Sequence, residues 1–370
     1  MKKPIQKIIN KMMEENVDIA FFDNPNTVYF LTGFRSDPHE RILATIILKN
    51  GTSFLFTPAL DEKDAKNIVE DFEVFSYLDT ENPWEIIKNK LSKENHSLLN
   101  WAIEKNYLTL LKKEYLESAF PESHYNHDFS NTLELLKLQK NPSELEKMKQ
   151  AGYWADESLR IGAETLKVGI TELEVVAKIE YELKKRGIKQ MSFDTMVLFG
   201  KNAASPHGEP GNNRLEKDQF VLFDLGVVHN GYTSDVTRTL FFGDQPSEHQ
   251  REVYETVLKA HDQAMQQVQI GMTAEELDAI ARDVITNKGY GVYFNHRLGH
   301  GLGQSVHEYP SIMSGNKLKL DKNMCFSIEP GIYITDDVGV RIEDCGYLDE
   351  VGFHSFTSFP TDIDTYKHLK

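Results

Sequence analysis

The chain contains little cysteine and no long apolar run. Cys325 and Cys345 are its only two cysteines among 370 residues, too few for the disulfide framework of a small secreted domain. No stretch approaches the roughly 20 apolar residues that a membrane-spanning helix needs. The N-terminus shows neither the apolar core nor the small-residue cleavage site of a secretion signal. These absences predict a cytoplasmic protein that has no membrane partner.

Positive charge is also scarce. The chain has 41 lysines and arginines against 57 aspartates and glutamates, which gives a formal net charge of −16. Nucleic-acid binding requires concentrated lysine and arginine, so no nucleic-acid partner is expected. Lysine-rich segments such as ELKKRG also contain acids and lie in predicted helices, a pattern typical of solvated helix faces. Part of the acidic excess is therefore compatible with a cluster of carboxylates that bound cations neutralise.

The length and the pattern of the chain predict two domains. Strand and helix signals alternate through the first 130 residues, including a hairpin at 41–58 that turns at Asn50-Gly51, so this part is a small α/β domain. We place the boundary after residue 132, which gives domains of residues 1–132 and 133–370.

A capped helix opens the second domain. Asn141 can cap this helix, Pro142 suits its first position, and Glu144 completes a capping box. Further on, the segments 168–188 and 270–290 both contain Gly-x-Thr-x-x-Glu, which is another helix-start signature. The matching residues are Thr171 with Glu174, Thr273 with Glu276, and the terminal glycines Gly187 and Gly289. About 40 residues after each helix comes an acidic hairpin, so we interpret the domain as a duplicated α/β unit.

The first acidic hairpin is DLGVVHNGYTSD, residues 224–235. Asn-Gly, here Asn230-Gly231, is the strongest short hairpin signal. A two-residue turn there pairs Asp224 with Thr237 and puts Asp235 on the same face, about 7–8 Å from Asp224 at the backbone. Two carboxylates in one apolar site repel each other, so a positive group must lie between them.

The second acidic hairpin is CFSIEPGIYITDDVGVRIEDCGYL, residues 325–348. A turn around Thr335–Asp337 puts Glu329, Arg341 and Glu343 on one face, beside both cysteines. As an alternative, the four acids of the two hairpins are strand ends or salt-bridge partners of Arg238 and Arg341. That interpretation does not explain why the acids of IEP and IED each follow an isoleucine in an apolar run.

Four carboxylates that converge on one cavity predict two divalent cations, which lie about 3.5–4 Å apart in known two-metal sites. Oxygen-rich ligation with one imidazole favours manganese(II), with cobalt(II) or zinc as alternatives. The candidate imidazoles are His207, His296, His300 and His307. A single histidine is more often a structural residue, but three in the glycine-rich segment NHRLGHGLGQSVHEYP favour a functional site. A two-metal centre supplies hydroxide near neutral pH and polarises a carbonyl, so it suits amide hydrolysis.

These motifs resemble those of the pita-bread metallopeptidases, which include methionine aminopeptidases, Xaa-Pro aminopeptidases and Xaa-Pro dipeptidases. The matching segments are DLG, SDVTRT, LGHGLG, IEPGIY and RIED. The resemblance implies a small N-terminal α/β domain, a C-terminal pita-bread domain of two pseudo-symmetric halves, and a homodimer. It also implies five ligands for two metal ions: Asp224, Asp235, His300, Glu329 and Glu343. Glu329 would in addition move the proton during hydrolysis by a hydroxide that bridges the metals.

The resemblance is greatest to short bacterial Xaa-Pro dipeptidases (prolidases). In the proline-specific branch, His207, His296 and His307 are similar to residues that hold the substrate and the tetrahedral intermediate. Arg341 is similar to an arginine that supports the metal carboxylates. We therefore expect Glu329, His296 and His307 to be catalytic, and His207 and Arg341 to contribute to substrate binding.

A dipeptidase must also recognise the free carboxylate of its small peptide substrate, which calls for a cation. Arg297 is our candidate, because Ser311–Lys319 lacks the arginine that some prolidases have before IEP. In this family the N-terminal domain of the partner subunit can reach the active site, so Asp37 and His39 in SDPHER are further substrate-binding candidates. The alternative for that segment is a polar surface loop.

Other activities are also known on this fold. An Xaa-Pro aminopeptidase that acts on longer peptides is the nearest alternative to a dipeptidase. A creatinase-like enzyme or a binding protein without catalysis is less compatible, because all five ligand types are present. A methionine aminopeptidase is less compatible because about a third of the chain precedes the catalytic half.

Overall fold

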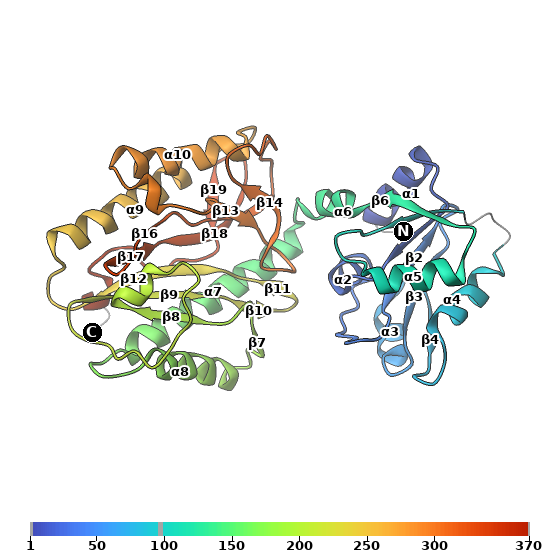
Figure 1. The fold of residues 1–370 in the computed structure, drawn as a ribbon, viewed down its shortest axis with the longest axis horizontal. Coiled ribbons are helices and arrows are strands. Elements are labelled where there is room, and N and C mark those ends of the chain that lie inside the picture. Colours follow the sequence, from blue (N-terminus) through green and yellow to red (C-terminus); the bar gives the residue numbers. More distant parts are fainter. Residues whose placement is uncertain (1–2, 95–98, 369–370) are drawn as a thin grey trace. The chain divides into compact units, whose positions relative to one another are not determined.

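The chain forms two compact units, Met1–Lys137 and Leu138–Lys370. The computed structural model describes residues 3–94 and 99–368 (Figure 1). Met1 and Lys2, the first residues of the N-terminus for which no secretion signal is expected, lie outside the described residues. Across the ranges described, no helix is both long and apolar enough to cross a membrane.

The N-terminal unit is built on one six-stranded sheet in the order β4-β3-β2-β1-β5-β6. Its elements are α1 Lys3–Glu14, β1 Ile19–Phe22, α2 Pro25–Thr32, β2 Ala44–Leu48, β3 Ser53–Pro58, α3 Glu62–Ile68, β4 Glu73–Tyr77, α4 Pro83–Leu91, β5 Asn100–Ile103, α5 Leu110–Ala119, β6 His124–Asp128 and α6 Ser130–Lys137. Apolar side chains of α1, α2, α3 and α6 form one core, and those of α4 and α5 form a second. Helices therefore cover both faces of the sheet.

The division between the units follows helix α6. The boundary predicted after residue 132 falls inside this helix, five residues before the division at Lys137. Leu133 of α6 is buried in the core of the N-terminal unit, so the whole helix belongs to that unit.

The C-terminal unit contains a larger sheet of eight strands. Its elements are α7 Pro142–Thr165, α8 Glu172–Lys185, β7 Gln190–Met191, β8 Met196–Phe199, η1 Gly200–Ala204, β9 Gln219–Leu225, β10 Val227–His229, β11 Tyr232–Thr233, β12 Val236–Phe242, α9 Glu248–Gln267, α10 Ala274–Asn287, η2 Gly291–Tyr293, β13 Gly299–Gly301, β14 Glu308–Ile312, β15 Cys325–Ile328, β16 Gly331–Ile334, β17 Val338–Arg341, β18 Glu343–Leu348, β19 Phe353–Ser355 and α11 Thr365–His368. The strand order is β14-β13-β15-β18-β12-β9-β8, with β19 on β18. Within this unit, α7 and α8 pack on one half of the sheet and α9 and α10 on the other (Figure 1).

The predicted duplication is visible at the starts of α8 and α10. Both helices begin with the expected capping box, formed by Thr171 with Glu174 and by Thr273 with Glu276. Before each box, a glycine with positive φ donates its N–H to a carbonyl about 46 to 49 residues later: Gly169 to Leu215 and Gly271 to Leu320, each at 2.8 Å. Equivalent turns therefore hold the two helices against equivalent parts of the unit.

The first acidic hairpin has the predicted register. His229 pairs with Tyr232 and Asp224 pairs with Thr237. Near Gly226 the ribbon divides: β9 and β12 belong to the main sheet, whereas β10 and β11 join β7 in a small sheet. Only glycine fits there, because a Cβ on Gly226 would lie 1.9 Å from the carbonyl oxygen of Ser234.

The second acidic hairpin also has the predicted turn. Ile334 pairs with Val338 across residues 335–337. This ribbon divides in the same manner, since β15 and β18 lie in the main sheet and β16 and β17 form a separate two-stranded sheet. Each division falls at acidic residues, so both ribbons present their carboxylates where the main sheet is interrupted.

Candidate metal centre

One cavity of about 730 Å³ in the C-terminal unit collects the predicted site residues of that unit. These lining residues are His207, Asp224, Asp235, His296, Arg297, His300, His307, Glu329, Arg341 and Glu343. The two remaining candidates, Asp37 and His39, belong to the N-terminal unit, where both side chains are exposed and His39 donates its backbone N–H to Asp37 Oδ1 at 3.2 Å. All the described residues that line this cavity belong to the C-terminal unit.

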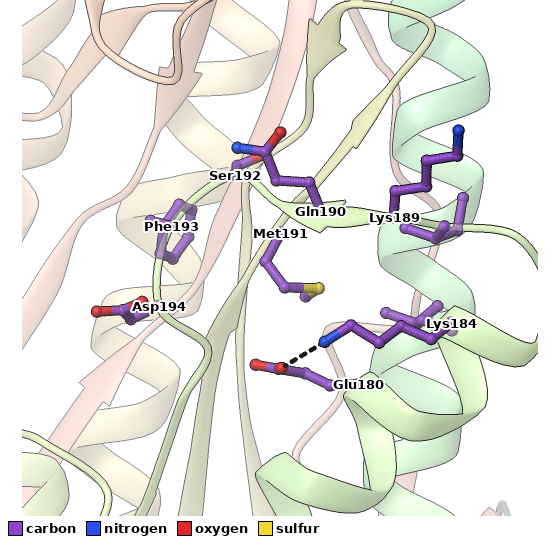
Figure 2. A pocket seen from close by; sticks show the side chains of 10 residues that line it. Glu180, Lys184, Lys189, Gln190, Met191, Ser192, Phe193 and Asp194 are labelled. Atoms are coloured by element: carbon purple, nitrogen blue, oxygen red, sulfur yellow. Dashed lines mark ion pairs between the residues drawn. The ribbon is translucent and has the colours of Figure 1, made fainter. Parts of the chain in front are cut away.

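A second pocket, of about 410 Å³, lies between α8 and the segment that follows it (Figure 2). Glu180 and Lys184 of α8 form an ion pair at 3.7 Å on its wall. Phe193 lines both this pocket and the larger cavity. The second pocket contains none of the predicted site residues.

Neighbouring strands of the main sheet bring the four carboxylates together. Asp224 is the penultimate residue of β9, Asp235 directly precedes β12, and Glu343 begins β18. Thr237 of β12 pairs with Asp224 on one side and with Glu343 on the other. Since directly opposed residues share a face, these carboxylates point to one side of the sheet, as the hairpin parity predicted. Glu329 follows β15, the neighbour of β18.

Asp235, His300 and Glu343 are arranged as ligands of a metal ion. Each offers one ligand atom, and these atoms lie within 4.8 Å of one another. All three side chains are buried. The glycines on either side of His300 let its strand approach its neighbours: a Cβ on Gly299 would lie 1.9 Å from a backbone oxygen of Ser327, and one on Gly301 would lie 2.3 Å from that of Tyr309. This explains the GHG motif.

The carboxylates lack partners in the chain. Among the described residues, no hydrogen-bond donor reaches Asp224 Oδ1, Asp235 Oδ1 or Glu343 Oε1, although each oxygen is buried. Such oxygens are rare in folded proteins and call for an ion or a water. Burial, followed by repulsion from Asp224 and Glu329, raises the pKa of Asp235 well above its ordinary value. A divalent cation would satisfy these oxygens and offset the repulsion, so the residues present fit a metal ion.

Glu343 and Glu329 show the same effect. Burial and the nearby carboxylate of Asp235 raise the pKa of Glu343 well above its ordinary value. Burial raises the pKa of Glu329 to about 7, with Arg341 opposing the shift and Asp224 adding to it. Without a cation the chain therefore favours proton uptake by these carboxyl groups.

The imidazole of His300 is ready to coordinate. Burial, and then the proximity of His307, lower the pKa of His300 to about 3, so the ring is neutral. Its Nδ1 lies 3.1 Å from the carbonyl oxygen of Gly301, and its Nε2 lies 3.5 Å from Asp235 Oδ2 and 3.3 Å from Glu329 Oε1. A proton on Nδ1 leaves Nε2 free to bind a metal ion beside the carboxylates.

Arg341 supports the cluster but does not neutralise it. Its Nη2 pairs with Asp224 Oδ2, its Nη1 donates to the hydroxyl of Tyr333 at 2.7 Å, and its Nε donates to Thr237 Oγ1 at 3.1 Å. The alternative that these acids are salt-bridge partners thus holds for Asp224 with Arg341. Arg238, the other arginine of that alternative, pairs with Asp344 instead. Arg341 forms an ion pair with only one of the four acids, Asp224, so most of their charge has no arginine or lysine partner among the described residues.

The sequence reasoning missed three hydroxyl groups that orient the cluster. Thr237 Oγ1 donates to Glu343 Oε2 at 2.7 Å, and Ser327 Oγ donates to Glu329 Oε1 at 3.1 Å. The hydroxyl of Tyr333 accepts from Arg341 and lies 3.1 Å from His296 Nε2. The hairpin register already opposed Thr237 to Asp224, which was a usable signal. The alternation of the second ribbon likewise placed Ser327 and Tyr333 on the face of Glu329.

The remaining histidines and Arg297 lie around the cluster. His296 Nδ1 lies 2.7 Å from the carbonyl of Arg297, which makes Nδ1 the protonated nitrogen and Nε2 the acceptor from Tyr333. Burial lowers the pKa of His296 to about 4. The ring of His307 meets the ring of His300 edge to face, with centroids 4.3 Å apart. The Arg297 guanidinium donates to Ser311 Oγ at 2.9 Å.

Known proteins share this architecture. The chain matches the model of metallopeptidase family M24 over residues 146–350 and that of the creatinase/prolidase N-terminal domain over residues 4–138. An Xaa-Pro dipeptidase of Lactobacillus helveticus is 46% identical over 360 residues, which cover 97% of this chain and 98% of the relative.

Solved structures agree over nearly the whole chain. The prolidase of Pyrococcus horikoshii OT3 is similar with a TM-score of 0.91 and 31% identity, over 98% of this chain and 100% of that one. The X-Pro aminopeptidase of Thermotoga maritima MSB8 is similar with a TM-score of 0.84 and 30% identity, over 94% and 97%. With its carboxylate-rich cavity and these relatives, the chain belongs to metallopeptidase family M24, as a pita-bread domain preceded by a creatinase/prolidase N-terminal domain.

Proposed function

We propose that this protein is an Xaa-Pro dipeptidase, which hydrolyses the peptide bond before proline in dipeptides with the help of divalent metal ions. The observation that carries the proposal is the group of buried carboxylates with unpartnered oxygens around a neutral His300 in the 730 Å³ cavity. Support comes from the Lactobacillus helveticus dipeptidase and the Pyrococcus horikoshii prolidase, which align with nearly the whole chain.

Membership of the family implies divalent metal ions at this centre. We assign two ions to the five candidate ligands Asp224, Asp235, His300, Glu329 and Glu343, and we expect manganese(II), with cobalt(II) or zinc as alternatives. When bound, two such ions make hydroxide available near neutral pH and polarise the scissile carbonyl.

Proton transfer falls to Glu329. Its carboxylate lies in the cavity, where Ser327 Oγ holds one oxygen. We propose that Glu329 takes the proton of the attacking water and delivers it to the proline nitrogen as the peptide bond breaks. Ser327 also accepts the backbone N–H of His300 at 3.0 Å, so one hydroxyl fixes the shuttle relative to a metal ligand.

His296 and His307 stabilise the transition state in different ways. Both ring nitrogens of His296 are engaged, one with the Arg297 carbonyl and one with Tyr333. Within the described parts of the chain, His307 makes a ring contact with His300 but no hydrogen bond. His307 is therefore free to donate to the developing oxyanion, while His296 orients Tyr333 and Arg341. His207 also lines the cavity, and we assign it to substrate binding.

The binding of the substrate carboxylate distinguishes a dipeptidase from the alternative, an Xaa-Pro aminopeptidase that acts on longer peptides. The likeness to the Thermotoga maritima X-Pro aminopeptidase favours keeping that alternative. We assign carboxylate recognition to Arg297, which lines the cavity. Arg297→Ala should raise KM for a dipeptide far more than for its amide, and equal effects on both would remove this role.

The homodimer, the cytoplasmic location and the contribution of Asp37 and His39 stay predictions. In the dimer hypothesis, the loop that carries Asp37 and His39 reaches the cavity of the partner subunit. Asp37→Ala and His39→Ala, assayed with dimer mass measured by light scattering, would test it. Unchanged dipeptide kinetics in both variants would contradict it.

The proposed function is tested by the substrate and metal requirement together. Protein stripped with a chelator should lose activity toward an Xaa-Pro dipeptide and regain it with manganese(II). The dipeptide should be cleaved with a higher kcat/KM than the Xaa-Pro-Yaa tripeptide. A preference for the tripeptide would favour the aminopeptidase, and full activity in protein shown to be metal-free would contradict both.

A further inference from the structure

The loop that carries His307 into the cavity, residues 302–307, connects β13 to β14. The backbone of this loop is held by Glu308, the residue that directly follows it. Glu308 Oε1 accepts the backbone N–H groups of Gln304 at 2.8 Å and Ser305 at 3.1 Å. Because Glu308 directly follows His307, this carboxylate closes the loop and fixes the backbone from which the His307 ring projects.

The carboxylate of Glu308 is paired with a lysine that is distant in sequence. Lys140 Nζ lies 2.9 Å from Glu308 Oε2, and the two side chains are only 5% and 10% exposed. Lys140 immediately precedes Asn141, the N-cap of α7, and its own N–H donates to the Asn323 carbonyl at 2.9 Å. A buried ion pair requires both members, since either charge alone is costly in this environment.

The opposite side of the loop is held by the first acidic ribbon. Thr233 donates its N–H to the Gly303 carbonyl at 2.8 Å, and its hydroxyl donates to the Ser305 carbonyl at 3.2 Å. Thr233 lies two residues before Asp235. The His307 loop is therefore fixed between a metal-ligand ribbon and the Lys140–Glu308 pair, and of these two attachments only the pair lies away from the candidate ligands.

We propose that Lys140 and Glu308 are positioning residues that fix His307 for the transition state of the reaction. The inference rests on the proposed function, and it assigns to Lys140 a role at a site that its own side chain does not line. The competing explanation is that the pair only stabilises the fold.

The first test is a split between kcat and KM. Lys140→Met should lower kcat for an Xaa-Pro dipeptide by about 10- to 100-fold, since a displaced catalytic group costs about that much. KM should change by less than about threefold, because the interaction acts mainly in the transition state. The matched control is Lys322→Met, which removes an exposed lysine that pairs with Glu350 at 2.6 Å, and it should leave both constants unchanged.

The second test asks whether Lys140 acts through His307. In a His307→Ala background, Lys140→Met should change kcat by less than about twofold, because the residue that it positions is gone. The same fold-loss in both backgrounds would overturn the proposal, because Lys140 would then act independently of His307.

The third test does not depend on activity. Hydrogen exchange at the amides of Gln304 and Ser305 should become at least about tenfold faster in Lys140→Met, and unchanged exchange would overturn the proposal. If Lys140→Met does not fold, the double variant Lys140→Met/Glu308→Gln removes both charges and is used instead, with faster exchange at Gln304 and Ser305 expected and wild-type exchange again overturning the proposal. If the parent protein fails to cleave Xaa-Pro dipeptides, the proposed function falls while the exchange measurement still decides whether the pair fixes the loop.

Discussion

Two consecutive residues of β18 carry buried carboxylates whose pKa values are shifted in opposite directions. Glu343 and Asp344 project from opposite faces of the strand. Asp344 lies 2.8 Å from Arg238 Nη2 and 3.1 Å from His261 Nε2. Burial opposes its charge, but Arg238 and His261 outweigh burial and hold the pKa of Asp344 well below its ordinary value. Glu343 receives one hydrogen bond, from Thr237, and its pKa is raised.

The comparison shows which partners distinguish an ordinary buried carboxylate from a candidate metal ligand. On one face of the sheet, the chain provides both the acid and its cations. On the other face it provides acids without enough cations, so the missing charge must come from solution. A buried carboxylate is thus ordinary when an arginine or histidine accompanies it, and it indicates a metal site when other acids accompany it instead.

The largest expected effect is that of Glu343→Gln. This change removes one charge from the cluster, so bound metal and dipeptidase activity should both fall to the detection limit. The chelated variant should melt at a higher temperature than chelated wild type, because repulsion with Asp235 is relieved. Metal analysis and thermal denaturation measure the two effects. If the variant bound as much metal as wild type, Glu343 would not be a metal ligand, and the proposed difference between the two faces of β18 would be wrong.

The reverse behaviour is expected of Asp344→Asn. Loss of this carboxylate leaves Arg238 and His261 buried without their anion, which should lower the free energy of unfolding by about 3–5 kcal/mol. Urea denaturation measures the loss, and excess manganese(II) should not restore it. A stability within experimental error of wild type would show that the pair on this face is dispensable.

A change of pH should affect the two faces in opposite senses in chelated protein. Burial raises the pKa of Glu329 to about 7 from an ordinary value of 4.5, so between these values the folded chain binds more protons than the unfolded chain. Stability therefore falls as the pH rises through this window, by up to about 3 kcal/mol. The stability that Asp344 contributes, with its lowered pKa, is lost only as the pH falls below its ordinary value of 3.8.

Thermal denaturation of chelated protein at pH 5 and pH 8 measures the effect of Glu329. Glu329→Gln should make the pH dependence of stability shallower, since the amide does not titrate, whereas Asp235 and Glu343 still contribute through their own raised pKa values. Equal slopes in the variant and in wild type would show that another group is responsible.

The smallest expected effect is that of Thr237→Val, which keeps the shape of the side chain and removes the hydroxyl bonded to Glu343. Loss of such a partner typically weakens metal affinity by about 10- to 100-fold, measured by competition with a chelator. Thr256→Val is the control, because Thr256 on α9 is equally buried and bonds only within its helix. Equal affinities in both variants would show that the Thr237 hydroxyl does not orient Glu343.

The sequence specified local structure well wherever strong turn and cap signals occur. Asn230 and Gly231 have φ values of 49° and 83°, which is the left-handed pair that an Asn-Gly hairpin turn requires. This turn sets the register of the hairpin, and the register determines the face on which Asp224 lies. Helix α4 begins where its local signals place it, because Asn82 caps it and Pro83 is its first residue. Strand β6 was not predicted, because its residues HYNHD bury only Tyr125 and show no apolar pattern.

Parity within each ribbon was enough to group the metal-ligand candidates and Arg341, but it did not give the contacts between the two ribbons. Parity within each ribbon put Asp224 with Asp235 and Glu329 with Glu343. No turn signal specifies the register between β12 and β18, because these strands come from different halves of the chain. The bond from Thr237 to Glu343 and the pairing of Arg238 with Asp344 depend on that register, so they became visible only in the structure.

In the main sheet, the two halves of the C-terminal unit meet along a very short seam. Strands β12 and β18 share only two residue pairs, Val236 with Asp344 and Thr237 with Glu343. If Asp235 and Glu343 bind a metal ion as we propose, that ion would join the first half to the second where β12 meets β18. We then expect the chelated protein to lose the contact between β12 and β18 before the helices of either half unfold.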